Sequence, residues 1–176
     1  MNRPLTPSAT LPIANVVLRA LVLLNWFVAA LIVVLLVAMP NAQWIMSALK
    51  LPQGPEADRV ILGLRSIAII GLATVPLHYA ILKRLLAIVA TVRAGDPFVA
   101  ANAHRLRTIA WILLTLQLAG IVIAAIARSI STPAHPIDID AAGFSINGWL
   151  AVLLTFLLAH VFSAGTMMRE DLEGTV

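Results

Sequence analysis

Residues 95–107 of this 176-residue chain read GDPFVAANAHRLR, and they lie between two long apolar runs. Gly95 is the residue type that ends a helix, because without a Cβ atom it adopts a left-handed conformation at little steric cost. Asp96 is then predicted to cap a second helix and Pro97 to be its first residue, where a missing N–H group costs nothing. The stretch therefore predicts a tight break between two long helices, with a cluster of arginines near the start of the second.

The composition around this stretch is that of a membrane protein. Hydrophobic residues make up 61% of the chain and charged residues 11%, with a mean hydropathy of +0.98, whereas ordinary soluble domains have roughly 45–50% and 25%. The absence of cysteine excludes disulfides, thiolate metal sites and cysteine nucleophiles. The net charge of +4 follows the loops rather than a soluble basic face, so no direct binding of nucleic acid is expected.

Four apolar runs are long enough to cross a hydrocarbon core of roughly 30 Å. They cover about residues 20–39, 60–82, 109–127 and 148–167. The first run is expected to be a retained span, because the apolar region of a cleaved signal peptide usually has only about 7–15 residues.

The second run continues as an amphipathic pattern toward Arg93, so its helix is expected to project beyond the bilayer before Gly95 ends it. Residues 44–49, in the first loop, are predicted to form a short interfacial helix. The predicted fold is therefore all-α: a single polytopic membrane domain over residues 1–176. Its four transmembrane helices form a bundle, with a projecting cytoplasmic hairpin between spans two and three.

The positive charges predict the orientation of these spans, because lysine and arginine concentrate in loops on the cytoplasmic side. One side carries eight of them: Arg3, Arg19, Lys83, Arg84, Arg93, Arg105, Arg107 and Arg169. The other side carries four: Lys50, Arg59, Arg65 and Arg128. The richer side is predicted to be cytoplasmic, which places both termini and residues 95–107 there.

Polar side chains inside a bilayer are costly, so each is a candidate functional residue. The spans contain one principal polar residue each: Asn25, His78, Gln117 and His160. Helical rise from the flanking charges places all four at a depth of about 8–15 Å, in the inner half of the membrane. Three interpretations remain open: hydrogen bonds between helices, a ligand- or proton-sensing layer, and unconnected side chains that are satisfied separately.

Enzymatic chemistry has little support in this pattern. The four spans contain no carboxylate, so reactions that need an intramembrane Asp or Glu lack their main residue. Two histidines on separate spans would suffice for bis-histidine haem, but no second pair and no surrounding glycine pattern accompany them. The sequence therefore predicts no catalytic residue, no metal site and no cofactor.

The cytoplasmic break carries a basic cluster: Lys83, Arg84, Arg93, His104, Arg105 and Arg107. One interpretation is contact with the anionic headgroups of the lipid bilayer, at about 1 kcal/mol per charge. The other is a docking face for an acidic patch on a cytoplasmic partner, with Phe98 as an apolar anchor ringed by charge; Phe98 could equally hold the loop against Leu106 or the membrane. The predicted docking residues are Asp96, Phe98, Asn102, Arg105 and Arg107.

Two groups of residues resemble the motifs of the bacterial four-span membrane family catalogued as domain of unknown function 2975. The first group comprises GDPF at residues 95–98, Asn102 and RLR at 105–107; the second comprises VF at 161–162, Gly165 and EDLEGTV at 170–176. The resemblance covers most of the chain, since the number and spacing of the spans also agree. Gly174 departs from it, because the family usually has an apolar residue there, commonly leucine.

Members of that family are typically encoded beside a small Cro/C1-type helix-turn-helix regulator. The resemblance therefore implies a protein of the bacterial inner membrane that acts as the membrane partner of such a regulator, and it implies no particular reaction or ligand. The alternative is a small-molecule binder or transporter subunit with an intramembrane cavity lined by the four polar residues. A structural or assembly subunit is the third class, and the sequence leaves the oligomeric state open, a homo-oligomer included.

Overall fold

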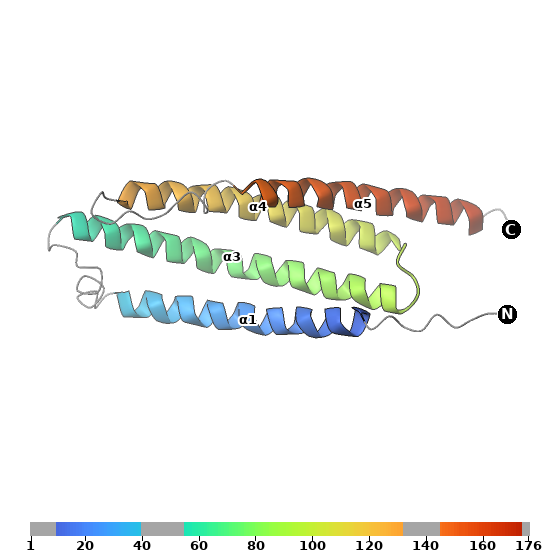
Figure 1. Cartoon of the computed structure of the whole chain (residues 1–176), viewed down its shortest axis with the longest axis horizontal. Helices are drawn as coiled ribbons and strands as arrows, with labels where there is room; N and C mark the ends of the chain where they lie inside the picture. The colour runs from blue at the N-terminus through green and yellow to red at the C-terminus, as the bar shows by residue number, and fades with distance from the viewer. Residues whose placement is uncertain (1–9, 40–54, 132–144, 174–176) are drawn as a thin grey trace.

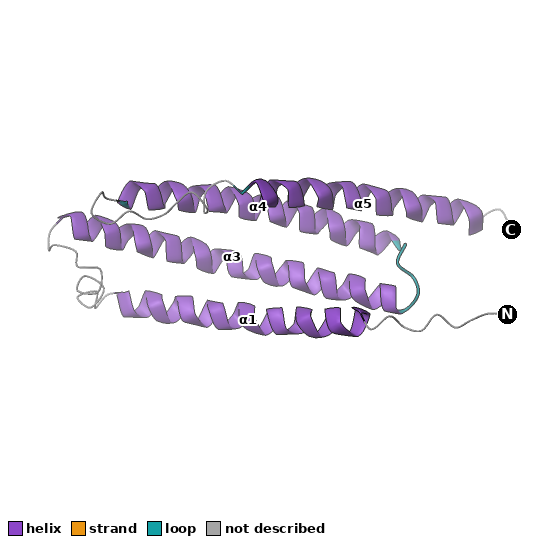
Figure 2. Ribbon diagram, viewed as in Figure 1, coloured by secondary structure: helices purple, strands orange, loops and turns teal. Residues whose placement is uncertain are grey.

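A computed structural model describes residues 10–39, 55–131 and 145–173, and its regular elements are helices (Figures 1 and 2). They are α1 (Thr10–Ala38), α3 (Pro55–Arg93), α4 (Ala100–Ile130) and α5 (Ile146–Glu173). All four are long and apolar enough to cross a membrane. The prediction of four helices, each long and apolar enough to span a membrane, is confirmed for the described residues. The predicted interfacial helix at 44–49 and the last three residues of the tail motif lie outside the described residues.

Helices that follow one another in the chain pack against one another: α1 on α3, α3 on α4, and α4 on α5. Figure 1 shows them side by side, each running opposite to the one before it. The start of α1, the segment between α3 and α4, and the end of α5 therefore lie at the same end of the molecule. We call residues 94–99 the connector, and this end the connector end.

Alanines occupy many of the contacts between the helices, and many large apolar side chains face outward. More than half of the buried apolar residues in the described part of the chain are alanines, among them Ala29, Ala110 and Ala159. Leu23, Phe27 and other large aliphatic or aromatic side chains are exposed on the helix surfaces. This distribution is typical of helices in lipid, where close backbone approach drives association and the hydrophobic effect does not.

Two of the helices extend well past their predicted spans at the connector end. α3 has 39 residues and ends at Arg93, eleven residues after the predicted span end at 82. α4 begins at Ala100, nine residues before its predicted span start at 109. At 1.5 Å per residue, these extensions are about 16 Å and 13 Å long. The expected continuation of the second helix to the glycine break is therefore present.

Candidate functional site

The connector follows α3, and Gly95 ends that helix as predicted. Its φ is +85°, in the left-handed region that glycine adopts without a Cβ clash. The N–H of Gly95 donates to the carbonyl of Val92, and the N–H of Asp96 donates to the carbonyl of Thr91, both at 3.1 Å. This is the Schellman pattern, which satisfies two carbonyls of the last helical turn.

The predicted start of the next helix is wrong. α4 begins at Ala100, three residues after Pro97, and its N-cap position is Val99, in an extended conformation with no side-chain cap hydrogen bond. The Asp96 carboxylate forms an ion pair with Arg169 of α5 and does not cap α4.

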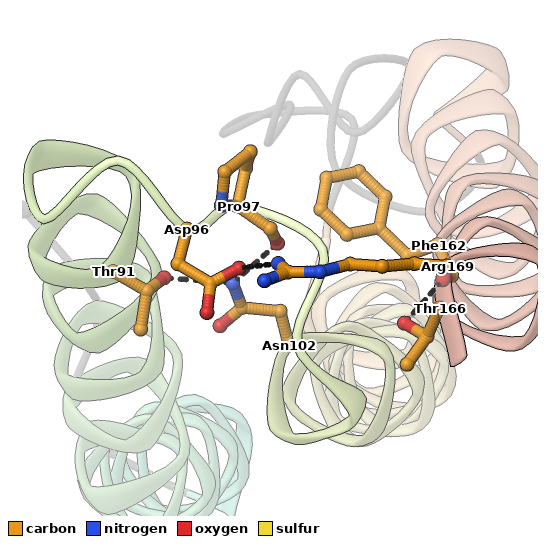
Figure 3. Close-up of polar contacts among 7 residues, drawn as sticks. All are labelled: Thr91, Asp96, Pro97, Asn102, Phe162, Thr166 and Arg169. Atoms are coloured by element: carbon orange, nitrogen blue, oxygen red, sulfur yellow. Dashed lines mark hydrogen bonds and ion pairs between the residues drawn. The ribbon is translucent and has the colours of Figure 1, made fainter. Parts of the chain in front are cut away.

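Asn102, in the first turn of α4, is the polar centre of the connector end (Figure 3). It has no exposed surface. Its Nδ2 donates to the Thr91 hydroxyl at 2.7 Å and to the Pro97 carbonyl at 2.9 Å. Its Oδ1 accepts from Nη1 of Arg105 at 2.7 Å. One buried amide therefore joins the last turn of α3, the connector and the first turns of α4.

The connector is also attached to the end of α5. Besides the Asp96–Arg169 ion pair, whose side chains are 42% and 46% exposed, the rings of Phe98 and Phe162 lie 5.3 Å apart and are tilted by 37°. A Cβ added at Gly165 would lie 3.0 Å from Cδ1 of Phe98, so the ring packs directly on the bare backbone of α5. We call this set the connector cluster: Thr91, Asp96, Pro97, Phe98, Asn102, Arg105, Phe162, Gly165 and Arg169.

The five predicted docking residues all lie at this end, but three of them have hydrogen-bond or ion-pair partners inside the protein. Asp96 pairs with Arg169, and Asn102 and Arg105 bind each other. Since Asn102 is fully buried, it can support a docking face only from beneath. Phe98, at 43% exposed, and Arg107 present surface to the outside.

Sequence reasoning missed four members of this cluster as partners of the connector: Thr91, Phe162, Gly165 and Arg169. Phe162 and Gly165 belong to the second group of residues in the family resemblance. The family resemblance joins this group with residues 95–107, and two distant motifs that occur together are a signal that they meet in the folded protein. Thr91 and Arg169 carried no comparable signal in a single sequence.

Two of the four intramembrane polar residues share a cavity between α1 and α3. Its volume is about 470 Å³, and Asn25, Thr74 and His78 are the polar residues of an otherwise aliphatic lining. Nδ2 of Asn25 donates to the Val75 carbonyl at 3.4 Å. Nδ1 of His78 lies 2.9 Å from the Thr74 carbonyl, which can only accept, so this nitrogen carries the proton.

The other two polar residues lie elsewhere. Nε2 of Gln117 donates to the Ser145 carbonyl at 3.3 Å, beside Gly148 at the start of α5. His160 is an exposed residue of α5, twelve residues and about 18 Å of helix beyond Gly148. The four polar residues therefore do not form one connected layer. Among the residues described, no group of three or more His, Asp or Glu side chains is arranged to hold a metal ion.

A search of protein-family models, curated proteins and solved structures found no match to this chain. The resemblance to domain of unknown function 2975 therefore stays a prediction, based on the residues quoted for it.

Proposed function

We propose that this protein is a non-enzymatic membrane protein whose connector end docks a small cytoplasmic DNA-binding regulator. In this proposal it resides in the bacterial inner membrane as a four-helix bundle, with both termini in the cytoplasm. The α3–α4 hairpin projects from the bilayer on that side. The observation that carries the proposal is the connector cluster, which joins three helix ends into one supported surface.

The exposed side chains of this surface suit an acidic partner. Arg93, His104 and Arg107 are all exposed, and Phe98 adds a partly exposed aromatic ring at the same end of the molecule. An apolar anchor surrounded by charge is how small interfaces gain affinity, while the charges mainly set specificity and association rate. The internal bonds of Asp96, Asn102 and Arg105 keep this surface in a fixed shape, which reduces the entropy lost on binding.

The class of partner comes from the resemblance alone. If the chain belongs to the family it resembles, its partner is the Cro/C1-type regulator encoded beside it. Seven of the residues that carry the resemblance belong to the connector cluster: Asp96, Pro97, Phe98, Asn102, Arg105, Phe162 and Gly165. This coincidence supports a shared use for the two motifs. An adjacent gene of another class would count against this partner.

The test is co-purification of the adjacent regulator with the full-length membrane protein. The variant carries Arg93→Glu with Arg107→Glu, and it leaves Arg105 intact because that residue bonds to Asn102. The matched control carries Arg59→Glu with Arg128→Glu, two exposed arginines near the opposite end. We expect the first variant to lose at least about tenfold of the retained regulator, equivalent to roughly 1.4 kcal/mol, and the control to retain it fully. Equal retention by both variants, or equal loss, would remove the connector end from the role.

A second candidate function is favoured by the α1–α3 cavity: binding of a small molecule from the membrane. Its volume of about 470 Å³ lies within the range of roughly 300–1,000 Å³ typical of ligand sites. This candidate uses Asn25 and His78, and it does not involve Gln117 or His160. It is compatible with the docking role, because α1 and α3 both reach the connector end (Figure 1).

A further inference from the structure

The α1–α3 cavity lies within the predicted membrane spans on both of its walls. Its lining runs from Leu21 to Ile32 on α1 and from Gly71 to Leu82 on α3. Apart from Asn25, Thr74 and His78, every lining residue is aliphatic or glycine. A molecule that enters from the lipid phase and is largely apolar therefore fits this lining.

Each of the three polar side chains that line the cavity has a hydrogen-bond acceptor left over. Nδ1 of His78 is bonded to the Thr74 carbonyl, and in the neutral form of the imidazole this leaves a lone pair on Nε2. One N–H of the Asn25 amide donates to the Val75 carbonyl, which leaves Oδ1 and the second N–H available to a ligand. The Thr74 hydroxyl donates its proton to the Gly71 carbonyl at 2.7 Å, so only its lone pairs remain.

Acceptors in an apolar cavity favour a ligand that brings donors, because an unmatched polar group away from water is costly. We propose that the α1–α3 cavity binds a neutral lipid whose headgroup carries free hydroxyl groups. This inference rests on the second candidate function, that the cavity is a binding site, and it names the class of ligand.

The position of the acceptors favours a neutral headgroup over a phosphate. His78 is five residues from Lys83, about 7.5 Å of helix, and the residues that line the cavity include no lysine or arginine. Ile81 and Leu82, which lie between these two residues in the chain, line the cavity together with Leu21. A phosphate drawn into the cavity would lose its hydration without meeting a cation, whereas a hydroxyl keeps its hydrogen bonds by donating to the acceptors.

The probes are 1-oleoylglycerol, which has two hydroxyl donors, and its 2,3-di-O-methyl ether, which has the same chain and no donor. Each is added to the full-length protein in detergent, and the bound fraction is measured by native mass spectrometry. We expect the wild-type protein to retain 1-oleoylglycerol about tenfold better than the ether, the ratio expected when the hydroxyl groups donate to acceptors that lie away from water.

Variants test whether the cavity residues cause the preference for 1-oleoylglycerol over the ether. The double variant Asn25→Leu with His78→Leu should reduce the preference for 1-oleoylglycerol to about one. The single variant His78→Gln, which keeps an acceptor, should keep much of this preference. His160→Leu is the matched control, since it removes a histidine outside the cavity, and it should keep the preference. Val28→Phe narrows the cavity without touching its polar groups and should release both probes. Circular dichroism and gel filtration establish that each variant is folded.

Each of the remaining outcomes would overturn one part of the cavity proposal. If the wild-type protein retains both probes equally and Val28→Phe releases both, the hydroxyl preference is wrong but the cavity is still a lipid site. If it retains neither probe, the binding site and the ligand class both fall. A wild-type dimer that retains no probe and dissociates in Val28→Phe would mean that a second copy fills the cavity. None of these results affects the co-purification test of the docking role.

Discussion

Arg169, near the end of α5, forms an ion pair with Asp96, which lies 73 residues earlier in the chain and directly follows the glycine that ends α3. The pair joins the connector to the end of α5, two segments that lie far apart in the sequence. Together with the Phe98–Phe162 contact, it attaches the connector to α5.

Breaking this ion pair should destabilise the protein only slightly, because both side chains are nearly half exposed. Asp96→Asn and Arg169→Gln should show a coupling of less than about 1 kcal/mol, as is usual for solvent-exposed pairs. The measurement is a double-mutant cycle of unfolding free energies in detergent, which isolates the pair from other contacts of Arg169. The coupling should shrink as salt is raised. A coupling above about 2 kcal/mol that is insensitive to salt would contradict the exposed geometry.

Asn102 should matter far more for stability. Asn102→Leu removes the donors to Thr91 and Pro97 and the acceptor for Arg105, in a position with no exposed surface. Groups left unmatched in a buried site cost about 1–3 kcal/mol each, so we expect a loss of roughly 2–4 kcal/mol. Thermal unfolding of the detergent-solubilised protein provides the measurement.

The matched control for this substitution is Asn147→Leu, which changes an exposed asparagine near the start of α5. It should alter the unfolding free energy by less than about 0.5 kcal/mol, as most surface substitutions do. If both asparagine variants melt at the wild-type temperature, the hydrogen bonds of Asn102 do not hold the connector end together.

The parts of this fold that the sequence predicted are those determined by local pattern. Runs of apolar residues indicated the four helices, and Gly95 indicated the end of α3, because helix length and the left-handed cap depend on neighbouring residues alone. The capping role predicted for Asp96 was wrong because its carboxylate meets a cation from α5. A single sequence holds no record of that tertiary contact.

The intramembrane polar residues show the same limit. Helical rise gave each residue a depth, but depth does not determine which helices are neighbours. Asn25 and His78 share a cavity because α1 packs on α3. Gln117 instead meets Ser145 and Gly148, because α5 begins beside the middle of α4. These pairings depend on the lateral order of the helices, which hydropathy leaves undetermined.

Two glycines of α3 should respond oppositely to alanine. A Cβ at Gly63 would lie 2.5 Å from Cγ2 of Ile130 on α4, which forces the two helices apart. A Cβ at Gly71 would meet only Cδ1 of Ile32, at an ordinary 3.8 Å. Since alanine in a helix is favoured over glycine by about 1 kcal/mol, Gly71→Ala should be neutral or stabilising. Gly63→Ala should destabilise by about 1–3 kcal/mol.

The clash at Gly63 can be tested directly by removing the atom involved. Ile130→Leu has no Cγ2 branch, so it should recover part of the stability lost in Gly63→Ala when the two are combined. The measurement is the unfolding temperature of the two single variants and the double variant. Additive losses in the double variant would show that the contact between Gly63 and Ile130 does not set the spacing of α3 and α4.

The proposed orientation can be tested with single cysteines, because the native chain has none. Ala94→Cys places a thiol in the exposed connector, and Ser129→Cys places one at an exposed position near the opposite end of α4. The excess of lysine and arginine around the connector predicts that it faces the cytoplasm. A membrane-impermeant maleimide added to intact spheroplasts should therefore label Ser129→Cys at once, and Ala94→Cys only after permeabilisation. The reverse pattern would place the connector cluster outside the cell, where it could not meet a cytoplasmic regulator, and the docking proposal would be wrong whatever the affinity of the isolated proteins.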